Sequence, residues 1–283
     1  MPHTSRRKKT RSNQKRREVV DADGWTKVLK TGPTQSSITI SSEAGPDDVE
    51  DGQTLDTLKS QYERLERKWL ESTAHRSLQQ ILCNRVFNSD QPVDRCFMFG
   101  SGSFSGVSNG LMGRHDVALY QLAIFTSIHN AAEERWQRRI PAYAQEPRYN
   151  SLDVEFLQGQ KVEEVKDPAG FDQITSSSLT YGPSAEMDVE LSVLRKRPAV
   201  HLGQRIEIFW RNDQGKVCTT RVGTGRQDQD DWEAGLATER EFIESKQSVA
   251  LPTFPVKDEP FHEQYLYWPK DSGGDSEAVE SCP

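Results

Sequence analysis

A turn rich in glycine and serine follows a short apolar run in residues 95–106, RCFMFGSGSFSG. Residues 96–99 have the length and composition of a buried strand. Gly100 and Gly102 lack the side chains that would keep a ligand phosphate from the backbone, as in the G-x-G-x-x-G turn of dinucleotide-binding proteins. Ser105 stands where the third glycine of that motif would be, so the match to a phosphate-binding turn is partial.

Three hydroxyl groups lie among these glycines, those of Ser101, Ser103 and Ser105. Hydroxyls and bare amides that converge on one turn suit phosphate or carboxylate binding, which predicts a site for an anionic small molecule. The alternative is that the glycines serve only a tight reversal of the chain, as they often do without any ligand. Both interpretations stay open from the sequence.

Other polar residues follow the later predicted strands. Glu146 stands after the second strand, where Rossmann-like proteins place a carboxylate for a ribose hydroxyl, or it could cap a helix that begins near Tyr149. Tyr181 and Ser184 stand at the end of a further strand. His201, at another strand end, could be an acid, a base or a ligand, or a hydrogen-bonded structural residue. No close spacing of cysteine or histidine indicates a metal site.

The elements that would position these residues alternate between strand and helix. An amphipathic lead-in helix begins at Leu55, since apolar residues step by three and four from there to Trp69, and it continues in a second piece to Leu82. The later predicted segments are helix 115–129, strand 138–147, helix 148–159, strand 161–167, strand 178–183, helix 184–196 and strand 198–203.

This alternation with short connections predicts parallel pairing and right-handed crossovers. We therefore expect an α/β protein with a single Rossmann-like domain, a mostly parallel open sheet, an N-terminal helical lead-in and disordered termini. The expected divisions are a basic arm and linker over 1–50, the lead-in over 51–90, the core over 91–215 and a C-terminal extension over 216–283. The turn at Gly100 should lie beside Glu146 and residues 181–184 at the carboxyl edge of the sheet.

Composition indicates a chain of which a good part lies outside the core. Of the 283 residues, 34% are apolar and 28% are charged, and the mean hydropathy is -0.77. Residues 1 to about 20, 32 to 50 and 270 to 283 are expected to lack regular structure. No apolar run is long enough to span a membrane, and the four cysteines read as reduced thiols, which favours the cytoplasm or the nucleus.

Charge is unevenly distributed along the chain. Residues 1–17 hold eight of the 36 basic residues and no acid, which leaves 28 basic against 43 acidic residues in the remainder. Such an arm could be a nuclear import signal, a contact to a nucleic-acid backbone or a solubilising tail. Nucleic acid is not the favoured partner, because the acidic body would repel a polyanion.

Several of these stretches in series resemble the Sensitivity to Red Light Reduced (SRR-like) domain family, in a fungal-type version. The stretches are CFMFGSGSF, HDVALYQLAIF, the long segment from AQEPRYNSLDVEF to SLTYGPSAE, and PAVHLG. Glu146, Pro147 and Tyr149 match the family's acid-Pro-x-aromatic motif, with Glu in place of the commoner Asp. After the proline of its strand-Pro motif many relatives have His and Cys, whereas this chain has Ser184 and Ala185, so haem or metal ligation is not expected there.

The resemblance implies a Rossmann-like domain with links to light signalling and circadian regulation in plants, and to haem biosynthesis or its regulation in yeast and animals. It brings no catalysed reaction, so we expect a regulatory, non-catalytic protein with a protein partner. One alternative is a nucleotide- or S-adenosylmethionine-dependent enzyme that uses the Gly100 turn; haem ranks below both cofactors. Another is a nuclear nucleic-acid-associated factor that acts through the basic arm.

Overall fold

The structure of the chain is a computed structural model that describes residues 16–20, 26–30, 45–88, 91–107, 114–183, 185–206, 237 and 239–270. Residues 1–43 and 44–283 form separate compact units. In the first unit, β1 (Arg16–Val20) and β2 (Thr26–Lys30) pair as an antiparallel hairpin. The expectation that residues 1 to about 20 lack regular structure is therefore wrong for β1. The valines of both strands favour extended backbone, and pairing satisfies their backbone groups.

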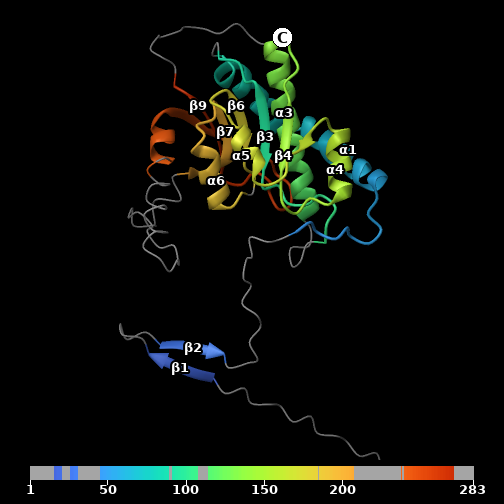
Figure 1. Ribbon diagram of the computed structural model, residues 1–283, viewed down its shortest axis with the longest axis vertical. Helices are drawn as coiled ribbons and strands as arrows, with labels where there is room; N and C mark the ends of the chain where they lie inside the picture. Colours follow the sequence, from blue (N-terminus) through green and yellow to red (C-terminus); the bar gives the residue numbers. More distant parts are fainter. Residues whose placement is uncertain are drawn as a thin grey trace, which may run out of the picture. The chain divides into compact units, whose positions relative to one another are not determined.

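The second unit is built on a sheet of seven strands in the order β5-β4-β3-β6-β7-β9-β8 (Figure 1). Every pairing from β5 to β7 is parallel, and β9 is antiparallel to both of its neighbours, β7 and β8. The predicted Rossmann-like α/β fold with a mostly parallel sheet is confirmed. The strands are β3 (Arg95–Phe99), β4 (Ala142–Gln145), β5 (Glu163–Glu164), β6 (Ser178–Tyr181), β7 (Val200–Gln204), β8 (Lys246–Ala250) and β9 (Gln264–Pro269).

The C-terminal part of the chain completes this sheet. Residues 216–283 were expected as an extension of the core, and within them β8 and β9 continue the sheet beyond β7. Because β3 leads outward to β4 and β5 and the chain then returns to β6 on the other side, the strand order reverses between β3 and β6. The carboxyl ends of these two strands therefore form the topological switch point, where α/β sheets bind ligands.

Helices cover both faces of the sheet (Figure 1). Successive side chains of β3 point to opposite faces of the sheet and show which helices cover each face. Cys96 and Met98 belong to the large core with helices α1 to α4, whereas Phe97 and Phe99 pack with residues of α5 and α6. The helices are α1 (Leu55–Leu70), α2 (Thr73–Ile81), α3 (Arg114–Trp136), α4 (Ser151–Gly159), α5 (Ala169–Gln173) and α6 (Met187–Leu194). A π-helical turn, η1 (Leu82–Val86), follows α2.

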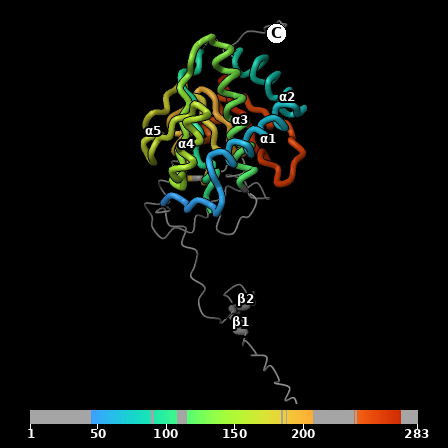
Figure 2. Tube along the Cα trace, turned by 90° about the vertical axis from the view of Figure 1, so that its right-hand side faces the viewer, coloured from blue at the N-terminus to red at the C-terminus, as the bar shows by residue number. Residues whose placement is uncertain are grey.

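The lead-in helices pack on α3, as the apolar spacing predicts (Figure 2). Thr54 caps α1 in a reciprocal pair with Thr57, and the apolar stripe from Leu58 to Trp69 is buried. Two buried polar contacts also fix how α1 is oriented against α3. Trp69 Nε1 donates to Ser127 Oγ at 2.9 Å, and Tyr62 Oη lies 3.1 Å from Thr126 Oγ1.

Two further observations bear on the sequence-based expectations. Cys83 is disulfide-bonded, so the expectation of reduced thiols is wrong at this residue, whereas Cys96 is free and buried. Among the described residues, no helix is both long and apolar enough to cross a membrane.

Candidate functional site

The glycine turn begins directly after β3. Gly100 and Gly102 both have φ of +72°, in the left-handed region that side chains other than glycine rarely adopt. A Cβ on Gly100 would lie 2.9 Å from the Cα of Ala185, whereas a Cβ on Gly102 would meet nothing within 4 Å. Gly100 is thus required by a close approach of the loop after β6, and Gly102 by its backbone conformation alone.

Glu146 lies at the end of β4, beside the turn. Its Oε2 accepts a hydrogen bond from the Gly102 amide at 2.9 Å, and its Oε1 accepts one from the Arg148 amide at 3.1 Å. Burial raises the pKa of this carboxyl, and the two amide hydrogen bonds oppose the shift. The alternative that Glu146 caps the following helix is wrong, because Asn150 is the N-cap of α4.

The serines of the turn converge on a second carboxylate, Asp153 of α4. Asp153 is fully buried, and burial raises its pKa. Sequence reasoning missed this residue, although Asn150 and Asp153 have the spacing of a reciprocal capping box. Asp153 accepts hydrogen bonds from Ser103 Oγ at 2.6 Å, Ser105 Oγ at 2.7 Å, Phe104 N at 3.1 Å and Asn150 N at 3.2 Å.

The aromatic residue of the acid-Pro-x-aromatic motif also reaches the turn. Tyr149 Oη lies 2.6 Å from Ser101 Oγ, and the Tyr149 ring stacks on Phe104 with centroids 5.3 Å apart. Both side chains are buried, and burial raises the pKa of the Tyr149 phenol well above its ordinary value. The motif and the glycine turn therefore form one hydrogen-bonded unit, which the sequence pattern alone did not indicate.

Tyr181 lies at the end of β6 on the other side of the switch point. Its hydroxyl donates to Gln264 Oε1 at 3.2 Å, and Gln264 Nε2 donates to the carbonyl of Pro183 at 2.7 Å. Tyr181 is fully buried, and through Gln264 it supports the loop after β6. Ser184 lies outside the described residues, but its neighbour Ala185 contacts Gly100.

His201 is separate from this unit, since its partners are Thr180 and Glu190. It is fully buried in β7, with Nδ1 2.9 Å from Thr180 Oγ1 and Nε2 2.7 Å from Glu190 Oε1. The Glu190 carboxylate occupies space that side chains on Gly182 and Gly203 would fill, since a Cβ there would lie 2.6 and 2.3 Å from its oxygens. Within the described part of the chain, Glu190 Oε2 is buried without a hydrogen-bond partner. This geometry favours the structural interpretation of His201.

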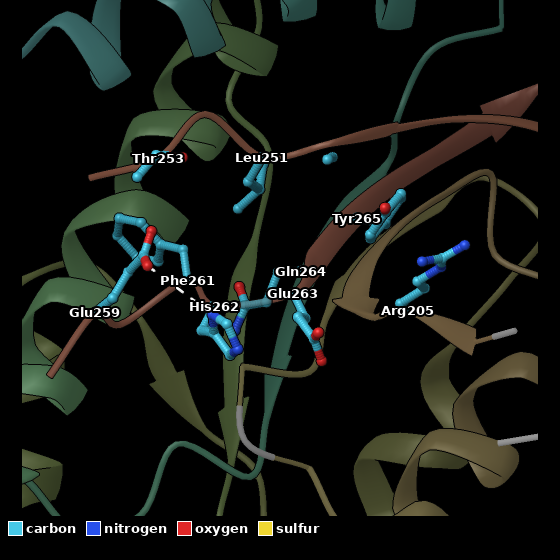
Figure 3. A pocket seen from close by; sticks show the side chains of 10 residues that line it. Arg205, Leu251, Thr253, Glu259, Phe261, His262, Glu263, Gln264 and Tyr265 are labelled. Carbon is cyan, nitrogen blue, oxygen red and sulfur yellow. Dashed lines mark ion pairs between the residues drawn. The ribbon is translucent and has the colours of Figure 1, made fainter. Parts of the chain in front are cut away.

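A small hollow of about 220 Å³ opens near the ends of β7 and β9 (Figure 3). Gln264 lines it and also holds the loop after β6, so the hollow adjoins the carboxyl edge of the sheet. His262 and Glu259 lie on its rim with Nδ1 and Oε2 3.9 Å apart. The described residues contain no group of three or more His, Cys, Asp or Glu side chains that could hold a metal ion.

The chain brings together Gly100, Ser101, Gly102, Ser103, Ser105 and Glu146, as the sequence predicts. The amides of Gly102 and Phe104 and the hydroxyls of Ser103 and Ser105 donate to carboxylates of the chain itself. An incoming phosphate would have to displace Glu146 or Asp153 and then lie close to a like charge. A ligand that donates hydrogen bonds to Glu146 meets no such conflict.

The fold and this site define a Rossmann-like α/β domain with a glycine turn held by internal carboxylates. The model of the SRR1 domain family matches residues 59–268, so the chain belongs to the SRR1 domain family. No curated protein matches the chain.

Two solved structures match the chain at low TM-scores. The SAH-bound methyltransferase PaMTH1 of Podospora anserina has 11% identity and a TM-score of 0.33, and the match covers 76% of this chain and 88% of that one. The methyltransferase domain of bacterial CtHen1 has 8% identity and a TM-score of 0.28, with 74% of this chain and 97% of that one covered. At these values the likeness carries no argument about fold or function.

Proposed function

We propose that the chain is a regulatory SRR1-family protein whose body acts by binding a protein partner and not by catalysis. The observation that carries this proposal is the internal use of the glycine turn. The Gly102 amide and the hydroxyls of Ser103 and Ser105 are bonded to Glu146 and Asp153, so the turn is stabilised without any ligand. The family resemblance adds the expected setting, which is light-type or circadian signalling or the regulation of haem biosynthesis, in the cytoplasm or the nucleus.

A ligand panel tests this proposal on the full chain. We expect that NAD, ATP and S-adenosylmethionine at millimolar concentration, and haemin at micromolar concentration, leave the melting temperature unchanged. A ligand that binds only the folded chain would raise it by mass action. An increase that is lost in Glu146→Gln would contradict the partner-binding proposal and place a small molecule at the turn.

One observation favours a second candidate, a nucleoside ligand without phosphate such as S-adenosylmethionine. Glu146 lies at the end of the strand next to β3, which is where Rossmann-like proteins bind ribose hydroxyls. A ribose hydroxyl donates to a carboxylate, whereas a dinucleotide would bring its pyrophosphate to the same carboxylates. In the panel, this candidate predicts a shift with S-adenosylmethionine and none with NAD or ATP.

The third candidate, a nucleic-acid-associated factor, depends on the basic arm. Residues 1–15 lie outside the described residues, so this stays a prediction. Deletion of residues 1–17 tests it: a nuclear import signal predicts loss of nuclear location, and a nucleic-acid contact predicts loss of salt-sensitive binding to duplex DNA or RNA.

A further inference from the structure

Residues 45–52, which we name the strap, lie across the loops that carry the candidate site before α1 begins. Three backbone hydrogen bonds join the strap to these loops: Asp47 N to Arg148 O at 3.0 Å, Glu50 N to Ser105 O at 2.8 Å and Val107 N to Asp48 O at 2.8 Å. An isolated antiparallel bridge pairs Val49 with Gly106. The strap therefore contacts both the turn after β3 and the loop after β4.

The main side-chain contact of the strap is a two-point ion pair. Arg148 Nε lies 3.0 Å from Asp47 Oδ1 and Arg148 Nη2 lies 2.8 Å from Asp47 Oδ2. The Asp47 side chain is only 15% exposed, which strengthens the pair relative to one in open water. The amide of Arg148 also donates to Glu146, so one residue connects the strap to the carboxylate that holds Gly102.

Little apolar surface holds the strap down. Every residue of the strap except Asp47 is exposed, and the apolar Val49 is 37% exposed. A segment held by polar contacts opens at a lower free energy than a segment anchored in the core. Gly52, with φ of +82° and open space around its Cβ position, can absorb the backbone change where the strap meets α1.

We propose that the strap is a releasable latch over the candidate site. Breaking the pair between Asp47 and Arg148 frees the strap, increases the exposure of the Arg148 side chain above its present 40% and loosens the hydrogen bond between Glu146 and Gly102. The latch goes beyond the proposed function, which assigns no place to the partner, and takes the glycine turn as the region that opening of the strap uncovers. It holds whether a protein or a nucleoside occupies that region.

Hydrogen exchange of single amides, followed by NMR on the full chain without ligand, tests the latch. Asp47→Asn removes the charge of the pair, and Asp48→Asn makes the same change at an exposed neighbour. We expect the amides of Glu50, Val107 and Gly102 to exchange about three- to tenfold faster in Asp47→Asn and unchanged in Asp48→Asn. Raising the salt concentration should speed these amides in the unmodified chain and have less effect in Asp47→Asn, because salt screens the pair.

Three results would overturn the latch. The first is equal exchange in Asp47→Asn and Asp48→Asn. The second is faster exchange at Glu50 and Val107 only when the amides of β3 speed up equally, because the strap would then not open on its own. The third is an unchanged Gly102 amide while the strap opens, which would remove the connection to the site. None of these results changes what the ligand panel is expected to show, so the latch and the proposed function can fail separately.

Discussion

The backbone amide of Gly102 donates to Oε2 of Glu146 at 2.9 Å, across the carboxyl ends of the adjacent parallel strands β3 and β4. This bond joins the glycine turn to the acid-Pro-x-aromatic motif, although 44 residues separate them in the sequence. It also directs a half-buried carboxylate at an amide that a phosphate-binding turn would leave free. The relationship explains why both motifs occur together in one chain without requiring a bound anion.

Glu146 should give the stability of the chain a characteristic pH dependence. Burial raises its pKa in the folded state above the ordinary value of 4.5, so the folded state binds the proton more tightly than the unfolded state. The free energy of unfolding should therefore fall as the pH rises through the window above 4.5. Urea unfolding between pH 4.5 and 7 should show a smaller fall in Glu146→Gln. Glu155→Gln, at an exposed position of α4, serves as the control and should keep the full fall.

Alanine at the two positive-φ glycines should have unequal effects. Gly102→Ala should cost about 1 to 2 kcal/mol, the strain of the left-handed conformation, because the space around it is open. Gly100→Ala adds a contact at 2.9 Å with the Ala185 backbone and should cost about 2 to 4 kcal/mol. Urea unfolding compares the two directly, and equal costs would contradict the close approach of the two loops.

The serines of the turn should contribute to stability. Ser103 Oγ donates to Asp153 and accepts from the amides of Gly106 at 2.8 Å and Ser105 at 3.3 Å. Ser103→Ala therefore removes one donor to Asp153 and the acceptor of both amides. We expect a loss of about 1 to 3 kcal/mol in the free energy of unfolding. The exposed Ser60 of α1 gives the matched control, because Ser60→Ala should change stability by less than about 0.5 kcal/mol. A neutral Ser103→Ala would show that the hydroxyl network is not formed in solution.

The order of strands and helices from α1 to β7, apart from the short α5, could be predicted from the sequence because it depends on local patterns. The three- and four-residue steps of α1 and the bounded apolar run of β3 are examples. The pairing of β9 with β7 could not be predicted from the sequence, since it joins segments about 60 residues apart and leaves no local signal. In the site, Glu146 was found from its strand end, whereas Asp153 was missed. Its role depends on how α4 is oriented against the turn, which only tertiary packing determines.

Lys246 should titrate close to physiological pH. Burial lowers its pKa from 10.5 to about 8, although Nζ donates to the carbonyls of Pro198 at 3.0 Å and Ala199 at 2.9 Å. Between about pH 8 and 10.5 the unfolded state binds more protons than the folded state, so stability should rise with pH in this window. NMR titration of the labelled Nζ gives the pKa directly. The rise should be absent in Lys246→Met, and an Nζ that titrates near 10.5 would contradict the burial of the amine.

The contact between His201 and Glu190 should behave as a buried, coupled pair. Glu190→Ala leaves His201 without the partner at 2.7 Å in a fully buried place, and we expect a loss of about 3 to 5 kcal/mol. His201→Phe leaves the Glu190 carboxylate buried and unpaired, with a similar cost. Replacing both by apolar residues, as in Glu190→Leu with His201→Phe, removes both unpaired groups and should cost clearly less than the sum of the single changes. A double-mutant cycle from urea unfolding measures this difference. Additive costs would show that the two side chains do not interact in the folded chain, and His201 would then return as a candidate acid, base or ligand.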